Sequence, residues 1–248
     1  MTAIDTLTPD AIAARLSGSP EERAAFVREA AQAGVAKAQA VYGQMLLDGT
    51  GVASDPAAAL GWFTRAAAQH HVMALNMVGR CYDLGWGTAV DKVHAAECYR
   101  IAAGRGLDWA MYNYATLLAL GDGVAEDKSA ALTLLEKVAA MGSGLASAKA
   151  INFVGSFAED GWACERDLAR AAECYASAAE GGDFRGCFNY ARMLGGAGDV
   201  DVALGWLRQA GARGNAAFLA KAEAWLAASD IPAFRTSGVA ALREGAVC

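Results

Sequence analysis

Apolar pairs recur along the chain at nearly constant intervals and predict a repeated structural unit. The pairs are Trp62-Phe63, Cys98-Tyr99, Leu134-Leu135, Cys174-Tyr175 and Trp206-Leu207. An aspartate precedes each pair, at positions 55, 91, 127, 167 and 199. Both series are separated by 36, 36, 40 and 32 residues, so two independent markers keep the same register. The chain is therefore predicted to contain five consecutive copies of one unit.

Each unit is predicted to fold as two helices joined by a Gly-rich turn. The first helix ends at a turn such as Asp48-Gly49-Thr50-Gly51-Val52, because glycine suits the left-handed backbone just past a helix end. The second helix begins near the aspartate, whose carboxylate can accept hydrogen bonds from free backbone N–H groups. These features predict an all-α solenoid of stacked helix-turn-helix repeats, which bury their apolar faces only against neighbouring copies.

The predicted repeats are flanked by capping segments. The repeats occupy residues 36–71, 72–107, 108–143, 144–183 and 184–215. Residues 1–35 are expected to form N-terminal capping helices, because Ser19-Pro20-Glu21-Glu22 is a capping box with proline at the first helical position. Residues 216–248 are expected to form a C-terminal capping helix and a tail, and from Ser229 onward this tail is expected to be at most weakly helical.

Two repeats depart from the common length. The fourth gains four residues before Gly155, which predicts one extra helical turn within residues 144–150. The fifth loses four residues in its inter-helix loop, residues 195–198, which predicts a different turn.

The repeat sequence resembles that of the Sel-one-like repeat (SLR) family, a relative of the tetratricopeptide repeats. The resemblance rests on Val78–Gly87, Gly49–Asp55 and Gly121–Lys128, where the glycines, the aspartate and the spacing agree together. It covers about residues 36–215 and implies a right-handed α–α superhelix whose first helices line a concave face. It also implies an adaptor or scaffold role, often in bacterial signalling, but no common partner.

One stripe of residues on the first helices is the candidate partner-binding face. It consists of Asn76, Arg80, Asp83, Trp109, Tyr112, Thr116, Asn152, Ser156, Arg185, Phe188 and Arg192. Asparagine can bond both the N–H and the C=O of an extended peptide, and arginine and aromatic residues are frequent interface anchors. The stripe therefore predicts a concave groove that binds a peptide or helix of another protein. The alternative is that Trp109 and Tyr112 pack between repeats and that the polar residues are merely solvated.

Asn113 and Asn189 lie one place off this stripe and are expected to bond between helices instead. Some tetratricopeptide relatives hold a C-terminal carboxylate with a clamp of lysine and asparagine. That clamp is not apparent here, because the first repeat has Ala40 and Gln44 in the stripe. Binding of a C-terminal carboxylate is therefore disfavoured.

Composition and charge argue against several classes of partner. Hydrophobic residues make up 55% of the 248 residues, yet no stretch approaches 18 uninterrupted apolar positions, so membrane insertion is not expected. The formal net charge is −6 and no Lys/Arg cluster occurs, which argues against binding nucleic acid. The N-terminus shows no signal peptide, which predicts a cytoplasmic protein. Its six cysteines are then expected to be reduced, small buried residues.

Catalytic motifs are absent from the sequence. It has no phosphate loop, no Gly-x-Ser-x-Gly elbow and no His-Glu-x-x-His pair. No Cys-x-x-Cys pair occurs, and His70, His71 and His94 lack further ligands nearby, so neither a metal nor a cofactor is predicted. The protein is therefore expected not to be an enzyme.

Two alternative functions stay open beside protein binding. One is a weak hydrolase of the β-lactamase-like type, which has been linked with cysteine-rich members of the family that the chain resembles. The other is a self-assembling structural solenoid. A monomer is expected, or a weak homodimer through an end helix if Trp225, Leu226 and Phe234 leave apolar area uncovered.

Overall fold

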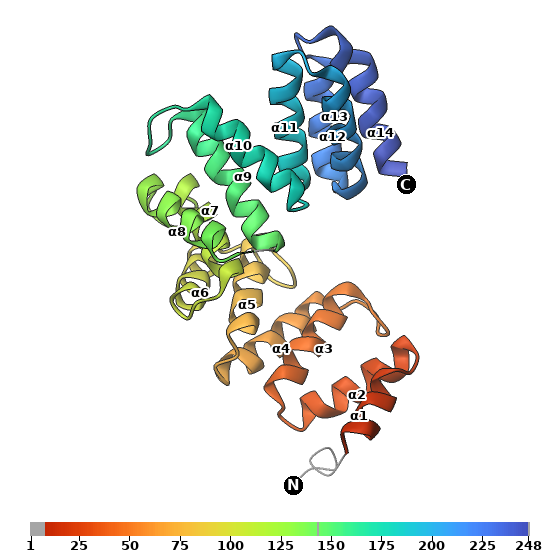
Figure 1. The fold of residues 1–248 in the computed structure, drawn as a ribbon. Helices are drawn as coiled ribbons and strands as arrows, with labels where there is room; N and C mark the ends of the chain where they lie inside the picture. The colour runs from red at the N-terminus through yellow and green to blue at the C-terminus, as the bar shows by residue number, and fades with distance from the viewer. Residues whose placement is uncertain (1–7, 143, 248) are drawn as a thin grey trace. The chain divides into compact units, whose positions relative to one another are not determined.

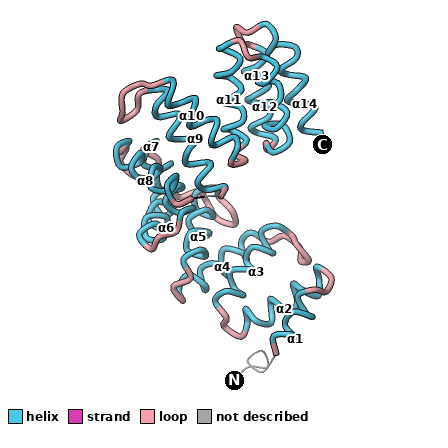
Figure 2. Tube along the Cα trace, viewed as in Figure 1, coloured by secondary structure: helices cyan, strands magenta, loops and turns pink. Residues whose placement is uncertain are grey.

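The computed structural model describes residues 8–142 and 144–247, and these are mostly helical (Figures 1 and 2). No strand occurs among the described residues, which confirms the all-α prediction. Within each of two units, most helices adjacent in sequence pack against one another as helical hairpins. The chain divides into two compact units, residues 1–126 and 127–248.

The first unit contains seven helices within its described residues. They are α1 (Pro9–Leu16), α2 (Pro20–Gln32), α3 (Ala36–Asp48), α4 (Pro56–Ala68), α5 (Val72–Leu84), α6 (Lys92–Gly104) and α7 (Asp108–Leu120). The predicted capping box is present at the start of α2, where Ser19 and Glu22 exchange hydrogen bonds with each other's backbone N–H. Helices α3, α5 and α7 are the first helices of their repeats, and α4 and α6 are second helices.

The second unit begins with the second helix of the third repeat. Its helices are α8 (Lys128–Ala140), α9 (Leu145–Asp160), α10 (Leu168–Glu180), α11 (Phe184–Ala197), α12 (Val200–Arg213), α13 (Ala216–Ala227), the π-helix η2 (Phe234–Gly238) and α14 (Val239–Val247). Helix α9 has 16 residues where α7 has 13, which confirms the extra turn predicted for the fourth repeat. Helix α11 runs on to Ala197, so the fifth repeat turns at Gly198 and its turn differs as predicted.

The predicted turn and cap chemistry is present in four repeats. The first helices α3, α5, α7 and α9 each end at a left-handed glycine, with φ between 67° and 73°. The side chains of Asp55, Asp91, Asp127 and Asp167 each accept a hydrogen bond of 2.9 Å from the backbone N–H three residues later. Asp199 also precedes its helix, but its side chain makes no such bond, because the loop before α12 is shortened.

A glycine on the first helix lets the aromatic ring of the second helix lie against its backbone. A Cβ atom at Gly79 would lie 2.7 Å from the ring of Tyr99, and one at Gly155 would lie 2.8 Å from the ring of Tyr175. Both tyrosines are 1% exposed and belong to the core. The recurring Gly and Tyr pair is therefore a packing contact that builds the hairpins of the second and fourth repeats.

The C-terminal tail differs from the prediction. It was expected to be at most weakly helical, yet η2 and α14 form and α14 packs against α12. Phe234 is completely buried, and a Cβ atom at Gly195 would lie only 2.2 Å from its ring. The tail therefore folds because the preceding repeat offers it a glycine-lined apolar surface, which no local propensity reveals.

This tail also removes most of the apolar surface predicted for a homodimer. Leu226 and Phe234 are fully buried within the chain, so the expectation that they would be uncovered was wrong. Trp225 alone of the three stays accessible, with 40% of its surface exposed.

Candidate functional site

The predicted stripe lies on α5, α7, α9 and α11, but its members differ in accessibility. Asn76, Asn152 and Phe188 are buried, and Arg185 is exposed. The other members, Arg80, Asp83, Trp109, Tyr112, Thr116, Ser156 and Arg192, are half-buried. In each unit, most stripe residues are therefore partly covered side chains, and one stripe asparagine is buried, Asn76 in the first unit and Asn152 in the second.

Each buried asparagine accepts a hydrogen bond from the next first helix. Asn113 donates from Nδ2 to Oδ1 of Asn76 at 3.1 Å, and Asn189 donates in the same way to Asn152 at 2.9 Å. The predicted inter-helix role of Asn113 and Asn189 is confirmed. Sequence reasoning missed that their partners are two stripe residues, although both pairs share a separation of 37 residues.

The amide groups of these asparagines are only partly used. Within the described residues, Nδ2 of Asn76, Oδ1 of Asn113 and Nδ2 of Asn152 have no hydrogen-bond partner, and none of them is fully buried. Oδ1 of Asn189 accepts a 3.3 Å bond from Nε of Arg192. Each pair therefore leaves a donor N–H without a partner, and the first pair also leaves an acceptor.

An acid seven residues after each buried asparagine, on the same helix, accepts a hydrogen bond from a tyrosine. Tyr99 donates its hydroxyl to Asp83 at 3.1 Å, and Tyr175 donates to Glu159 at 2.6 Å. Burial, reinforced by the neighbouring carboxylate, raises the pKa of both tyrosines well above the usual range, so both stay protonated donors. We call Asn76, Asp83, Lys92, Tyr99 and Asn113 the Asp83 cluster, and Asn152, Glu159, Tyr175, Asn189 and Arg192 the Glu159 cluster.

The two clusters neutralise their acids with different cations. In the Asp83 cluster, Nζ of Lys92 lies 2.6 Å from Asp83 and 3.0 Å from Asp122, and the bond to Asp83 is the largest influence raising the pKa of Lys92. In the Glu159 cluster, Arg192 donates both terminal nitrogens to the carboxylate at 3.2 and 2.9 Å. Burial raises the pKa of Glu159, but the bonds from Arg192 and Tyr175 outweigh it and lower this pKa overall.

Aromatic rings support the arginines of the stripe. The guanidinium of Arg80 lies over the ring of Trp86 at 4.6 Å, and that of Arg192 lies over Trp225 at 5.6 Å. Trp109 and Tyr112 meet edge to face at 6.5 Å, and this contact lies within α7 and not between repeats.

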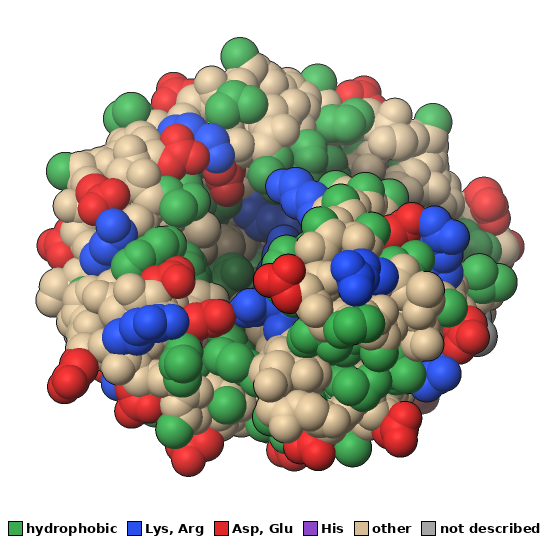
Figure 3. All heavy atoms as spheres, turned by 90° about the horizontal axis from the view of Figure 1, so that it is seen from above, with side chains coloured by type: hydrophobic (Ala, Val, Ile, Leu, Met, Phe, Trp, Pro, Cys, Tyr) green, Lys and Arg blue, Asp and Glu red, His purple; other side chains and the backbone are tan. Residues whose placement is uncertain are grey.

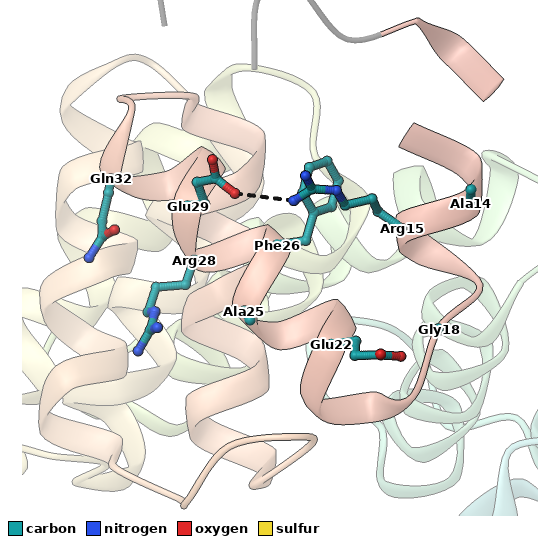
Figure 4. A pocket seen from close by; sticks show the side chains of 9 residues that line it. All are labelled: Ala14, Arg15, Gly18, Glu22, Ala25, Phe26, Arg28, Glu29 and Gln32. Carbon is teal, nitrogen blue, oxygen red and sulfur yellow. Dashed lines mark hydrogen bonds and ion pairs between the residues drawn. The ribbon is translucent and has the colours of Figure 1, made fainter. Parts of the chain in front are cut away.

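Two surface hollows lie near the ends of the units, and sequence reasoning found neither. One, of about 360 Å³, is lined by Arg192, Met193, Trp225, Ala228, Ser229, Asp230 and Ile231. The other, of about 690 Å³, lies between α1 and α2 (Figure 4). Arg15 bonds to Glu29 at 3.4 Å across it and covers Phe26. These hollows depend on how short helices dock, which has no sequence motif.

The described cysteines range from buried to half-buried, and one histidine caps a helix. Cys81, Cys98 and Cys187 are buried, as expected, whereas Cys164 and Cys174 are half-buried and Cys248 lies outside the described residues. Burial raises the pKa of Cys81 and of Cys98 to about 11. His71 accepts a hydrogen bond from the N–H of Ala74 and so caps α5. No group of three metal-ligating side chains occurs in the described part of the chain.

The charged surface is mixed in sign. On the face that Figure 3 shows, Lys and Arg side chains are interspersed with Asp and Glu. Among the described residues, no helix has the length and apolar character needed to span a membrane.

Comparison with known proteins identifies the repeat. A family model described as Sel1 repeat matches residues 36–71, 72–107, 110–143, 148–183 and 185–215. No curated protein sequence matches the chain.

Several solved structures share the fold. A protective antigen of uropathogenic Escherichia coli with an SLR fold has 24% identity and a TM-score of 0.63 over 92% of this chain, which spans only 48% of that protein. A Sel1 repeat protein from Oxalobacter formigenes has 24% identity and a TM-score of 0.61, with 90% and 83% of the two chains covered. An immunity protein from Pseudomonas aeruginosa has 14% identity and a TM-score of 0.58, with 86% and 81% covered. At these identities the likeness establishes the fold alone.

Proposed function

Because the chain belongs to the Sel1 repeat family, we propose that it is a non-catalytic adaptor or signalling regulator that binds an extended peptide or a partner helix on its first helices. Sel1 repeats are generally protein-interaction modules, and this proposal assigns the binding to the stripe that includes Asn76, Tyr112 and Asn152. A cytoplasmic location fits such a role and belongs to the same proposal.

The observation that carries this proposal is the repeated asparagine pair. In the first pair, the unused N–H of Asn76 and the unused C=O of Asn113 match the acceptor and donor of a peptide main chain, and in the second pair the N–H of Asn152 matches an acceptor. The inter-helix bonds hold these amides in a fixed orientation, so a bound segment does not have to order them. The half-buried Trp109 and Tyr112 lie on the same stripe and supply the aromatic contact area that interfaces favour.

Peptide selection followed by measured affinities tests the assignment. Peptides of 16 residues are enriched from a random display library on the wild-type protein, and their Kd values are measured by fluorescence anisotropy. Two stripe variants are compared, Asn76→Ala/Asn152→Ala and Tyr112→Ala, after circular dichroism and melting show that each is folded. We expect each to weaken binding by about tenfold or more, as hot-spot truncations do.

The control variant is Thr133→Ala/Glu173→Ala, which changes exposed residues of the second helices α8 and α10. It should leave Kd within about twofold of wild type, because surface substitutions away from an interface change little. Equal weakening by the control and the stripe variants would overturn the first-helix assignment. If no peptide is enriched at all, peptide binding itself is rejected.

A further inference from the structure

Arg80 and Arg192 occupy the same position of their repeats. Arg80 directly follows Gly79 on α5, and Arg192 directly follows Ala191, the corresponding small residue on α11. Both guanidinium groups are half-buried and both lie over a tryptophan ring. The two arginines are therefore presented in similar ways, one in each unit.

The two arginines differ in whether a carboxylate pairs with them. Arg192 forms a two-pronged ion pair with Glu159, which stands 33 residues earlier on the preceding first helix. The residue 33 positions before Arg80 is Leu47, which cannot supply a carboxylate. Within the described residues, Arg80 contacts only the sulfur of Met77 at 3.9 Å and the ring of Trp86, and no acid pairs with it.

The surroundings of Arg80 also favour binding of an anion by its guanidinium group. Stacking on Trp86 holds its guanidinium plane, so little further side-chain order is lost when its N–H groups form bonds. The nearest acid along its helix, Asp83, is already bonded to Lys92 and Tyr99. Asn76 lies one helical turn before Arg80 and presents its unused Nδ2 on the same stripe.

We infer that Arg80 binds a side-chain carboxylate, of Asp or Glu, in the extended segment that the first helices of the first unit hold. This inference rests on the proposed function and adds the chemistry of the partner. The Asn76 and Asn113 amides bind the main chain of that segment, and the guanidinium forms a charge-assisted pair with an acidic side chain nearby. Arg192 does not take this role, because Glu159 already occupies its donors.

Capped peptides of defined charge test the inference directly. The probes are acetylated and amidated hexaglutamate, acetylated and amidated (Gly-Ser)3, and acetylated (Gly-Ser)3 with a free C-terminus. Each is titrated into 15N-labelled protein at low salt, and the Nε–Hε signals of the arginines are followed by NMR. The protein's net charge of −6 repels a polyanion, so non-specific attraction does not imitate the expected result.

We expect hexaglutamate to shift the Arg80 signal saturably and to leave the Arg192 signal in place. The Arg80→Gln variant should weaken binding of hexaglutamate by at least about tenfold, because a charge-assisted pair is lost. The neutral capped peptide should shift neither signal. A shift of Arg80 by the free C-terminus alone would overturn the assignment to a side-chain carboxylate.

Two reciprocal variants exchange the behaviour of the arginines. Leu47→Glu places an acid at the position that Glu159 occupies for Arg192, and it should abolish the response of Arg80. Glu159→Gln keeps an acceptor for Tyr175 but removes the carboxylate that pairs with Arg192. The guanidinium of Arg192 should then respond to hexaglutamate. If hexaglutamate moves neither arginine in any of these proteins, the inference fails. Peptide binding that is still lost in Asn76→Ala/Asn152→Ala would show that the proposed function survives that failure.

Discussion

The Asp83 cluster and the Glu159 cluster share a frame and differ in their charge. Both contain an asparagine pair 37 residues apart and a tyrosine bonded to an acid 16 residues before it. In the first, Lys92 neutralises the acid, and no carboxylate in the described part of the chain pairs with Arg80. In the second, Arg192 neutralises the acid and uses its own donors.

This difference shows that a repeat can keep its packing while its surface chemistry changes. The tyrosine and glycine that build the hairpin are constant between the second and fourth repeats. The cation comes from a second helix in one case and from the following first helix in the other. Substitutions at the shared positions should therefore affect both units alike, and substitutions at the cations should separate them.

The largest effect is expected where a glycine admits the tyrosine ring. Gly79→Ala and Gly155→Ala should each lower the free energy of unfolding by about 2–3 kcal/mol, because the new Cβ atom overlaps a buried ring. Urea unfolding followed by circular dichroism measures the change. Gly61→Ala is the matched control, because nothing lies within 4 Å of a Cβ atom there and the change should be neutral or stabilising. A strong effect in only one of the two repeats would contradict the claim that the Gly and Tyr contact packs both hairpins in the same way.

An intermediate effect is expected at the acid of the second unit, and it depends on pH. The folded-state pKa of Glu159 lies below its ordinary value of 4.5, so its stabilisation is present above that pH and is lost as the pH falls through the lowered pKa. Glu159→Gln should cost about 1.5 kcal/mol at pH 7, the contribution of a charged hydrogen bond, and should flatten the acid limb of stability. Unfolding free energies measured from pH 7 to pH 3 check this.

Lys92 gives the opposite pH dependence in the first unit. Its pKa is raised, so its stabilisation is present below the ordinary lysine value of 10.5 and is lost as the pH rises through the raised pKa. Lys92→Met should therefore reduce the loss of stability at alkaline pH, because the variant has no ammonium group to titrate there. For the acid of the second unit, an equal loss of unfolding free energy between pH 7 and pH 3 in wild type and Glu159→Gln would contradict the ion pair of Glu159 with Arg192.

The smallest effect is expected in the turn after α9. Ala163 has φ of 55°, whereas the corresponding residue of the third repeat is Gly123 with φ of 73°. Ala163→Gly should raise the free energy of unfolding by about 1 kcal/mol, because the left-handed conformation costs alanine roughly that much. Gly123→Ala is the reverse test and should be destabilising, because its Cβ atom would lie 2.3 Å from the backbone of Lys92. A neutral result at Ala163 would mean that its turn carries no strain.

Sequence reasoning predicted most of the fold and only part of the candidate site. The repeat, the left-handed glycines and the aspartate caps follow from short-range rules, and the glycines and caps are present together in four of the five repeats. The stripe positions could be read from helical periodicity, but the burial of Asn76 and Asn152 could not. It arises from their bonds to Asn113 and Asn189, on the next first helix.

The sequence by itself determined the helical hairpin and its repetition, because glycine turns, caps and apolar pairs act within one unit. The tertiary structure decided which charges are paired and which end of the chain is covered. Arg192 bonds to Glu159 only because neighbouring first helices bring residues 33 positions apart together. Helix α14 forms where it can pack against α12. Such contacts depend on the register between elements, and a local pattern of residues does not encode it.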